Sequence, residues 1–192
     1  MDLINYNKGD EPFTIEDYYN TPEETHVELI NGVFYNMAPP NRIHQKISMY
    51  LSNVIDNYIN SKGGSCEVYA APFGVQLSAD DDKTIVEPDI SVICDKNKLT
   101  DKGCIGAPDW IIEIVSPSSA SNDYIRKLGL YKKSKVKHYW IANFDSDSVA
   151  VYSLANEYSD PVTYSFSDTV PSGLYEDLAI DFSEIKRSAH VS

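Results

Sequence analysis

Apolar positions recur with a helical period in one long segment of the chain. Between residues 42 and 60 they return every three or four positions, which places them on one face of an amphipathic helix that Gly63-Gly64 terminates. These positions are Ile43, Ile47, Leu51, Val54, Ile55, Tyr58 and Ile59. His44 lies in the first turn and is expected to face the protein, as a core or capping residue or in a functional role.

The most apolar short stretch, residues 109–117, is predicted to be a buried central strand. Five β-prone apolar residues surround one carboxylate, Glu113, and Pro117 ends a run that is too short for a typical helix. An unpaired charge in an apolar interior costs several kcal/mol. Glu113 is therefore expected to be paired with a structural Arg or Lys, protonated, metal-bound, or placed at a cleft or water-filled edge.

A second carboxylate, Asp89, lies in a similar apolar run at residues 84–94. Pro88 cannot donate to a sheet ladder, so it marks a strand edge, a strand start or a bulge, where a neighbouring side chain can be aimed into a cleft. The separation from Glu113 is 113 − 89 = 24 residues, enough for two adjacent strands joined by the polar loop 95–108. Carboxylates on adjacent strands can share a hard divalent cation.

A hairpin is predicted over residues 26–37, because Asn31-Gly32 favours a type I′ turn between two apolar-rich segments. If Ile30 pairs with Val33, then Glu28 pairs with Tyr35. Glu28 is a third acid of interest. Its position alone suits an ordinary exposed strand residue.

The other segments predict a short helix, further strands and a packing tail. Thr14-Ile15-Glu16-Asp17 has the pattern of an N-cap with an acid three residues on, which indicates a helix to about Asn20. Strands are expected at 66–77, where the alternation is best at its end, and at 138–144 and 149–154, which complete the sheet. Residues 174–185 are predicted to be packing strands or caps.

After the central strand, a Ser-rich connection leads into a helix within residues 118–134. Its inward stripe holds Tyr124, Lys127, Leu128 and Tyr131. Lys127 therefore points inward. A pair between Lys127 and Asp123 across one turn is the simpler reading, worth a few tenths of a kcal/mol on a helix surface.

Bulk composition predicts an ordinary globular chain of one domain: 192 residues, 42% hydrophobic and 23% charged. No apolar run approaches the roughly 18 residues of a spanning helix, and the N-terminus lacks the features of a signal peptide. We therefore expect a cytoplasmic protein without a membrane partner. Cys66, Cys94 and Cys104 are an odd set without metal-ligand spacing, which predicts reduced thiols and no structural zinc.

The charge balance argues against nucleic-acid binding, which usually draws on a basic footprint. Lys plus Arg minus Asp plus Glu is 16 − 29 = −13. Six basic residues nevertheless gather in one predicted helix and its exit, beside the acids: Arg126, Lys127, Lys132, Lys133, Lys135 and Lys137. Except for Lys127, they fit equally well as a solvated helical face near a C-terminus, where cations suit the dipole.

In their order, these motifs resemble the signature of the PD-(D/E)XK nuclease superfamily, which has the restriction-endonuclease-like fold, and more closely the Uma-two family of bacterial endonucleases. The matching pieces are Val27-Glu28-Leu29-Ile30-Asn31-Gly32-Val33, Met37-Ala38-Pro39-Pro40, His44-Gln45, Glu87-Pro88-Asp89-Ile90-Ser91-Val92, Ala107-Pro108-Asp109, Ile112-Glu113-Ile114-Val115-Ser116-Pro117-Ser118, Asp123, Lys127, Tyr131 and Tyr139-Trp140-Ile141. The resemblance implies a single α/β domain over residues 1–192, with its core at about 14–185 and a mixed sheet flanked by helices.

For function, the resemblance implies a metal-dependent endonuclease that hydrolyses DNA phosphodiester bonds with Mg²⁺ or Mn²⁺. Asp89, Glu113 and the Ile114 carbonyl would hold the metal, and Glu28 would contact it directly or through water. DNA would be a weakly bound, salt-sensitive partner, because only a local basic patch attracts phosphate.

Three further residues receive roles from the resemblance. In the superfamily's usual motif the lysine follows two residues after the acid, where this chain has Val115. Lys127 would take its place, position or help deprotonate the attacking water, and steady the developing charge. His44 could orient Glu28 or a phosphate, and Asp123 is a second accessory residue.

Two rival functions stay open from the sequence. The first is a catalytically silent binding or scaffold protein that keeps the nuclease fold, favoured by the acidity and by the absent motif lysine. The second is a metal-dependent hydrolase of small phosphoesters. The sequence also leaves open whether the chain forms a homo-oligomer.

Overall fold

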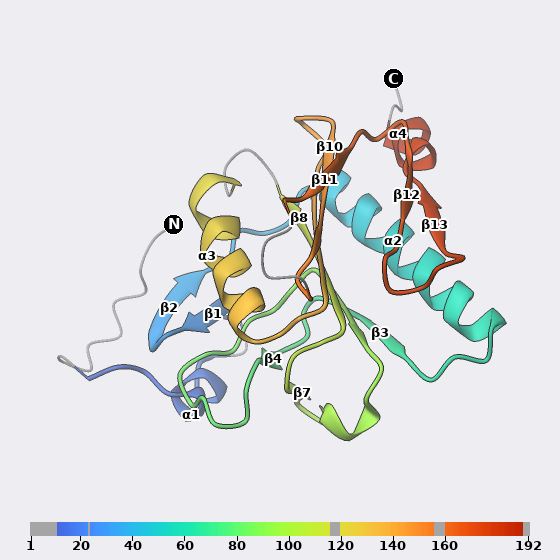
Figure 1. The fold of residues 1–192 in the computed structure, drawn as a ribbon. Helices are drawn as coiled ribbons and strands as arrows, with labels where there is room; N and C mark the ends of the chain where they lie inside the picture. Colours follow the sequence, from blue (N-terminus) through green and yellow to red (C-terminus); the bar gives the residue numbers. More distant parts are fainter. Residues whose placement is uncertain (1–10, 23, 116–119, 156–159, 190–192) are drawn as a thin grey trace.

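The structure is a computed structural model that describes residues 11–22, 24–115, 120–155 and 160–189, with the backbone alone at 120–124 and 188–189. A six-stranded sheet, called the main sheet below, lies at its centre (Figure 1). Its strands in spatial order are β11 (Val162–Tyr164), β10 (Ser148–Ser153), β9 (His138–Asn143), β8 (Trp110–Val115), β5 (Ile90–Ile93) and β3 (Glu67–Ala70). Neighbours are antiparallel except for the parallel pair β8 and β9. The predicted α/β domain with a mixed sheet is confirmed.

Helices cover both faces of the main sheet, and β8 is buried between them. Trp110 and Ile112 of β8 pack with the apolar face of α2 (Arg42–Ser61), whereas Ile111 packs on the opposite face with residues of α3 (Ala120–Lys133). Parallel neighbours need a crossover, and α3 supplies it between β8 and β9. Figure 1 shows α2 on one side of the sheet and α3 on the other.

The apolar face of α2 is the one that the sequence predicts. Ile47, Leu51 and Ile55 are fully buried, and each contributes about 1.5–3 kcal/mol by leaving water. The C-terminal tail closes the same core with β12 (Thr169–Pro171), β13 (Ala179–Asp181) and α4 (Ser183–Ala189). In the part of the chain that the structure describes, no helix has the length and apolar character to cross a membrane.

The predicted hairpin is present as β1 (Val27–Ile30) and β2 (Val33–Asn36), and Glu28 is opposite Tyr35. Asn31 and Gly32 have φ angles of 50° and 78°, as a type I′ turn requires. The hairpin is a separate sheet, linked to the chain before β5 by the paired backbones of Leu29 and Ile85. The short helix α1 (Ile15–Tyr19) begins at the predicted capping box.

Residues 66–77 do not form one strand, contrary to the prediction. β3 ends before Pro72, which cannot donate to a ladder, and only Val75–Gln76 continues as β4. β4 joins a three-stranded sheet with β7 (Gly103–Ile105) and β6 (Leu99–Thr100). The segment 95–108, predicted to be a polar loop, therefore carries two strands and the 3₁₀ helix η1 (Lys96–Lys98).

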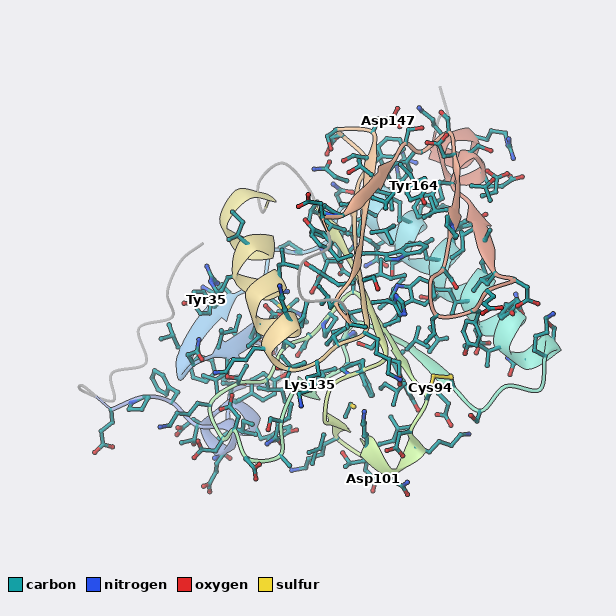
Figure 2. All side chains as sticks on the ribbon, viewed as in Figure 1. Tyr35, Cys94, Asp101, Lys135, Asp147 and Tyr164 are labelled. Atoms are coloured by element: carbon teal, nitrogen blue, oxygen red, sulfur yellow. A yellow bond between two sulfur atoms is a disulfide. The ribbon has the colours of Figure 1, made fainter. Side chains whose placement is uncertain are left out.

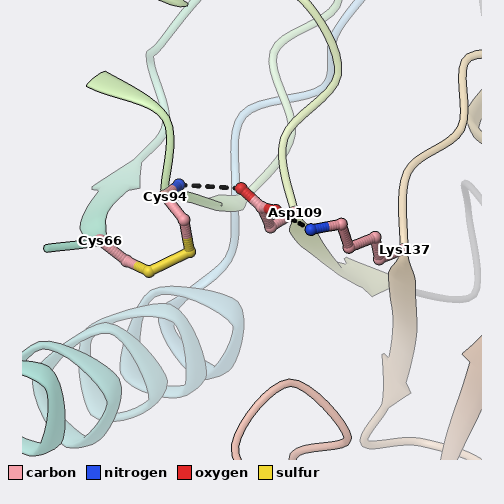
Figure 3. The surroundings of a disulfide bond; sticks show 4 residues. All are labelled: Cys66, Cys94, Asp109 and Lys137. Carbon is pink, nitrogen blue, oxygen red and sulfur yellow. Dashed lines mark hydrogen bonds and ion pairs between the residues drawn. A yellow bond between two sulfur atoms is a disulfide. The ribbon is translucent and has the colours of Figure 1, made fainter. Parts of the chain in front are cut away.

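The expectation of three reduced cysteines is wrong for two of them. Cys66 and Cys94 form a disulfide (Figure 3). Cys104 is a buried free thiol. Glu67 of β3 is opposite Ile93 of β5, so the two cysteines are the next facing pair along this antiparallel ladder. That proximity arises from the strand register, which the spacing of the cysteines along the sequence does not reveal.

Candidate functional site

Glu113 lies on β8, on the face of the main sheet that packs against α3. Its side chain is buried, and its Oε1 accepts hydrogen bonds from Lys127 Nζ at 3.1 Å and from the Tyr131 hydroxyl at 2.7 Å. The sequence left several environments open for Glu113. The structure shows it paired with a cation, Lys127.

Lys127 reaches this carboxylate from α3. Its side chain is 6% exposed, and its Nζ also lies 2.8 Å from Glu28 Oε1, so the ammonium stands between two carboxylates. A surface pair with Asp123 does not explain a lysine buried to this extent. The side chain of Asp123 itself lies outside the described residues.

Glu28 completes this group from β1, and it is 1% exposed rather than on the surface. Its Oε1 also accepts the backbone N–H of Glu87 at 2.9 Å. The hairpin meets α3 at a second point, where the Arg126 guanidinium lies over the Tyr35 ring, 4.2 Å from its centroid. We call Glu28, Glu113, Lys127 and Tyr131 the carboxylate–lysine cluster.

Tyr131 is a cluster member to which sequence reasoning gave no role of its own. It is fully buried, and its ring packs edge-on against Tyr139 with centroids 4.9 Å apart. Burial and the charge of Glu113 raise the pKa of Tyr131 well above its usual value, so the hydroxyl keeps the proton that it donates. The available signal was its spacing of four residues from Lys127, which puts both on one helix face.

Asp89 lies directly before β5, after the predicted irregularity at Pro88. Its Oδ2 accepts the Ile114 backbone N–H at 2.7 Å, and its Oδ1 is 3.1 Å from His44 Nε2. The structure therefore places His44 against Asp89 and not, as suggested from the resemblance, against Glu28. In the described part of the chain, the buried His44 Nδ1 has no hydrogen-bond partner.

Negative charge predominates in this region. Burial, together with the charges of Asp89 and Glu28, raises the pKa of Glu113 to about 7, against the opposing effects of Lys127 and Tyr131. Burial alone would lower the pKa of His44, but the hydrogen bond and charge of Asp89 outweigh it and raise that pKa. Additional positive charge would therefore be favourable here.

The donor chemistry fits a hard divalent cation, which prefers carboxylate oxygens. Asp89 immediately precedes β5, which pairs with the strand of Glu113, and Glu113 Oε2 receives no hydrogen bond from the described residues. Within those residues, no group of three or more His, Cys, Asp or Glu side chains is placed as a metal site. Two carboxylates suffice for Mg²⁺, which commonly takes its other ligands from water and substrate phosphate.

The predicted basic residues do not all surround these acids. Lys127 belongs to the cluster and Arg126 contacts Tyr35. The other four lie in the last turn of α3 or between α3 and β9: Lys132, Lys133, Lys135 and Lys137. Trp110 is opposite His138 and Glu113 is opposite Ile141, so Lys137 lies four residues, about 13 Å, along the strands from Glu113. Lys137 is therefore not beside Glu113 but pairs with Asp109.

A search of solved structures finds a chain with the same fold. A crystal structure of a putative nuclease belonging to DUF820 from Anabaena variabilis superposes with a TM-score of 0.73 and 21% sequence identity. The match covers 91% of this chain and 97% of that one. At this identity the likeness establishes the fold, which confirms the nuclease-like architecture that the resemblance implies.

Sequence comparisons identify the family. An uncharacterized protein of Synechocystis sp., slr1290, is 28% identical over 126 residues, which are 65% of this chain and 64% of that protein, just under two thirds of its length. The model of the Uma2 family, described as "Putative restriction endonuclease", matches residues 15–183. Because that match covers most of the 192 residues, the chain belongs to the Uma2 family.

Proposed function

We propose that this protein is a divalent-metal-dependent endonuclease that hydrolyses DNA phosphodiester bonds. The observation that carries the proposal is the Lys127 ammonium, buried between Glu28 and Glu113 in a protein of the Uma2 family. The superfamily motif lysine is absent from β8, where Val115 stands in its place, and Lys127 brings an ammonium to the same acid from α3.

In this proposal the acids hold the cofactor. Asp89, Glu113 and the Ile114 carbonyl would bind Mg²⁺ or Mn²⁺, with Glu28 as a direct or water-mediated ligand. A divalent cation at this place supplies Lewis-acid polarisation of the scissile phosphate.

The chain's own groups would orient the reaction. The Lys127 ammonium would position the attacking water and stabilise the charge that develops on the phosphate oxygens. Tyr131 and Glu28 would fix Glu113 and Lys127, because each bonds to one of them at 2.7–2.8 Å. A site held in this way loses little free energy to reorganisation during the reaction.

The main rival is a catalytically silent protein that keeps the fold to bind or organise a partner. The net charge of −13 favours it, because such a chain repels nucleic acid overall. Under this rival, the burial of Lys127 between two acids has only a structural purpose. A small-phosphoester hydrolase would use the same metal site and is separated from the nuclease by its substrate.

The experiment is a paired measurement of metal binding and DNA cleavage. Calorimetry with Mn²⁺ should give a saturable isotherm for wild type and a much weaker one for Glu113→Ala. Supercoiled plasmid and single-stranded DNA are then incubated with Mn²⁺ or Mg²⁺, and cleavage should be lost in Glu113→Ala. Identical isotherms for the two proteins would show that the metal site is wrong.

Inert wild type on both DNA forms, with metal bound normally, would support the silent protein instead. Release of phosphate from p-nitrophenyl phosphate without DNA cleavage would support the small-phosphoester hydrolase. Lys62→Ala is a suitable control, since Lys62 caps the far end of α2 and pairs with Asp177.

A further inference from the structure

Two adjoining hollows lie beside the C-terminal end of α3. The first has a volume of about 540 Å³ and is lined by Lys98, Lys135 and Lys137 with Asp95, Asp109 and apolar neighbours. The second, about 730 Å³, is lined by Lys132, Lys133, Lys135 and Lys137 with apolar residues. Lys135 and Lys137 belong to both, so the hollows form one surface, which we call the lysine surface. Figure 2 marks Lys135 on it.

The acidic groups of the lysine surface already have partners. Asp109 Oδ2 accepts the Cys94 backbone N–H at 2.8 Å, and Asp109 Oδ1 pairs with Lys137 at 2.7 Å (Figure 3). Asp95 caps η1 through a hydrogen bond from the Asn97 backbone N–H. These carboxylates are therefore committed to local structure.

Several ammonium groups of the lysine surface are not paired with these carboxylates. The Lys98 ammonium donates to the neutral carbonyl of Ala107 at 2.8 Å. Among the described residues, neither Lys133 nor Lys135 forms an ion pair with a carboxylate, and both are exposed. In a chain with a net charge of −13, three unneutralised ammonium groups around joined hollows are a local exception.

Lys135 stands where the backbone favours glycine. It follows the end of α3 with φ of 64°, and the Lys135 and Val136 N–H groups close the helix onto the carbonyls of Lys132 and Tyr131. This is the left-handed position of a Schellman motif, which glycine fills without steric cost. The helix dipole explains lysines in the last turn, but a strained lysine beyond it points to a use for its ammonium.

We infer that the lysine surface binds the phosphate backbone of nucleic acid at a distance from the carboxylate–lysine cluster. A single small anion would occupy one hollow, whereas a chain of regularly spaced phosphates can contact ammonium groups in both. The inference rests on the proposed function, since α3 carries Lys127 at its centre and these lysines at its end. The lysine surface would hold DNA that flanks the cleaved bond.

The test measures DNA binding without catalysis. A fluorescein-labelled 20-nucleotide duplex is titrated in EDTA, by anisotropy, at several salt concentrations. Lys133→Gln and Lys135→Gly should each weaken binding by about three- to tenfold. Each should also reduce the magnitude of the slope of log affinity against log salt by about one. The control Lys62→Gln carries the same charge change at the far end of α2 and should leave affinity within twofold.

Lys135→Gly separates binding from structure. Glycine suits the left-handed backbone, so this variant should melt at the wild-type temperature or above it while binding DNA more weakly. Equal DNA affinity of wild type, Lys133→Gln and Lys135→Gly would overturn the inference even if metal-dependent cleavage is found. Tighter binding of polyglutamate than of DNA would overturn it in favour of an acidic protein partner. If both variants bind DNA more weakly but wild type never cleaves DNA, the lysine surface is upheld and the nuclease is refuted.

Discussion

Lys127 is the ammonium that neutralises two buried carboxylates, and in the proposed function it also takes part in the reaction. Removing one partner of a buried ion pair typically costs about 3–5 kcal/mol, since the remaining charge is left without compensation. Because Lys127 is buried, Lys127→Ala is expected to lower the stability of the fold as well as the activity. Activity of this variant has to be read against the fraction that is folded.

We expect Lys127→Ala to lower the turnover of DNA cleavage by roughly 10²-fold or more, corrected for folded protein. The same variant should melt at a lower temperature than wild type in EDTA and regain stability in Mn²⁺, because a divalent cation replaces the missing positive charge. Cleavage kinetics and thermal melts monitored by circular dichroism measure both effects. Wild-type turnover in Lys127→Ala would remove Lys127 from the reaction.

Glu113 should make stability depend on pH in the metal-free protein. Its pKa is raised to about 7 by burial, from an ordinary value of 4.5, so the folded protein binds this proton more tightly than the unfolded chain does. The stabilising contribution of protonated Glu113 is full below pH 4.5 and is lost as the pH rises through about 7.

Glu113→Gln removes this titration. In EDTA the variant should therefore gain stability relative to wild type on going from pH 5 to pH 8, on the order of 1 kcal/mol or more. Urea unfolding at the two pH values measures the difference. A stability difference that stays constant between them would mean that Glu113 titrates normally.

Among the secondary-structure elements, those with a strong local pattern could be predicted and those defined by distant contacts could not. The period of α2, the Asn31-Gly32 turn and the apolar run of β8 each determine their element locally. By contrast, β4, β6 and β7 are two or three residues long and exist through pairing with one another. Short strands of this kind have no period to detect.

The same distinction separates the site residues. Glu113 and Lys127 could be selected because a charge in an apolar pattern is anomalous. The burial of Glu28 and the contact of His44 with Asp89 depend on where the hairpin and α2 pack, and no local pattern records this. Tyr131 was visible on the helix stripe, but its hydroxyl bond to Glu113 follows only from the docking of α3 on the main sheet.

The disulfide between β3 and β5 should contribute substantially to stability. Cys66 and Cys94 are 28 residues apart, and closing a loop of this length restricts the unfolded chain by about 3–4 kcal/mol in the chain-entropy model. A reductant should lower the melting temperature of wild type by about 10 °C. The double variant Cys66→Ala/Cys94→Ala should melt at that lower temperature with or without reductant. An unchanged wild-type melt under reduction would show that the bond does not form in solution.

For the whole molecule, the net charge of −13 opposes DNA while the lysine surface attracts it. We expect binding of a short duplex to be weak and to fall steeply as salt rises from 50 to 200 mM, because each phosphate contact releases counterions. Anisotropy titrations over this range measure the slope. Affinity that does not respond to salt would contradict an electrostatic mode of binding.

The docking of α3 also determines when the site can exist during synthesis. Glu28, Asp89 and Glu113 leave the ribosome before Lys127, the residue that holds two of them together. A nascent chain that ends before residue 127 therefore lacks the ammonium, and the three acids Glu28, Asp89 and Glu113 have no cation between them. Contacts this distant in sequence form late in folding. A protein built in this way gains the carboxylate–lysine cluster only when most of its core is already in place.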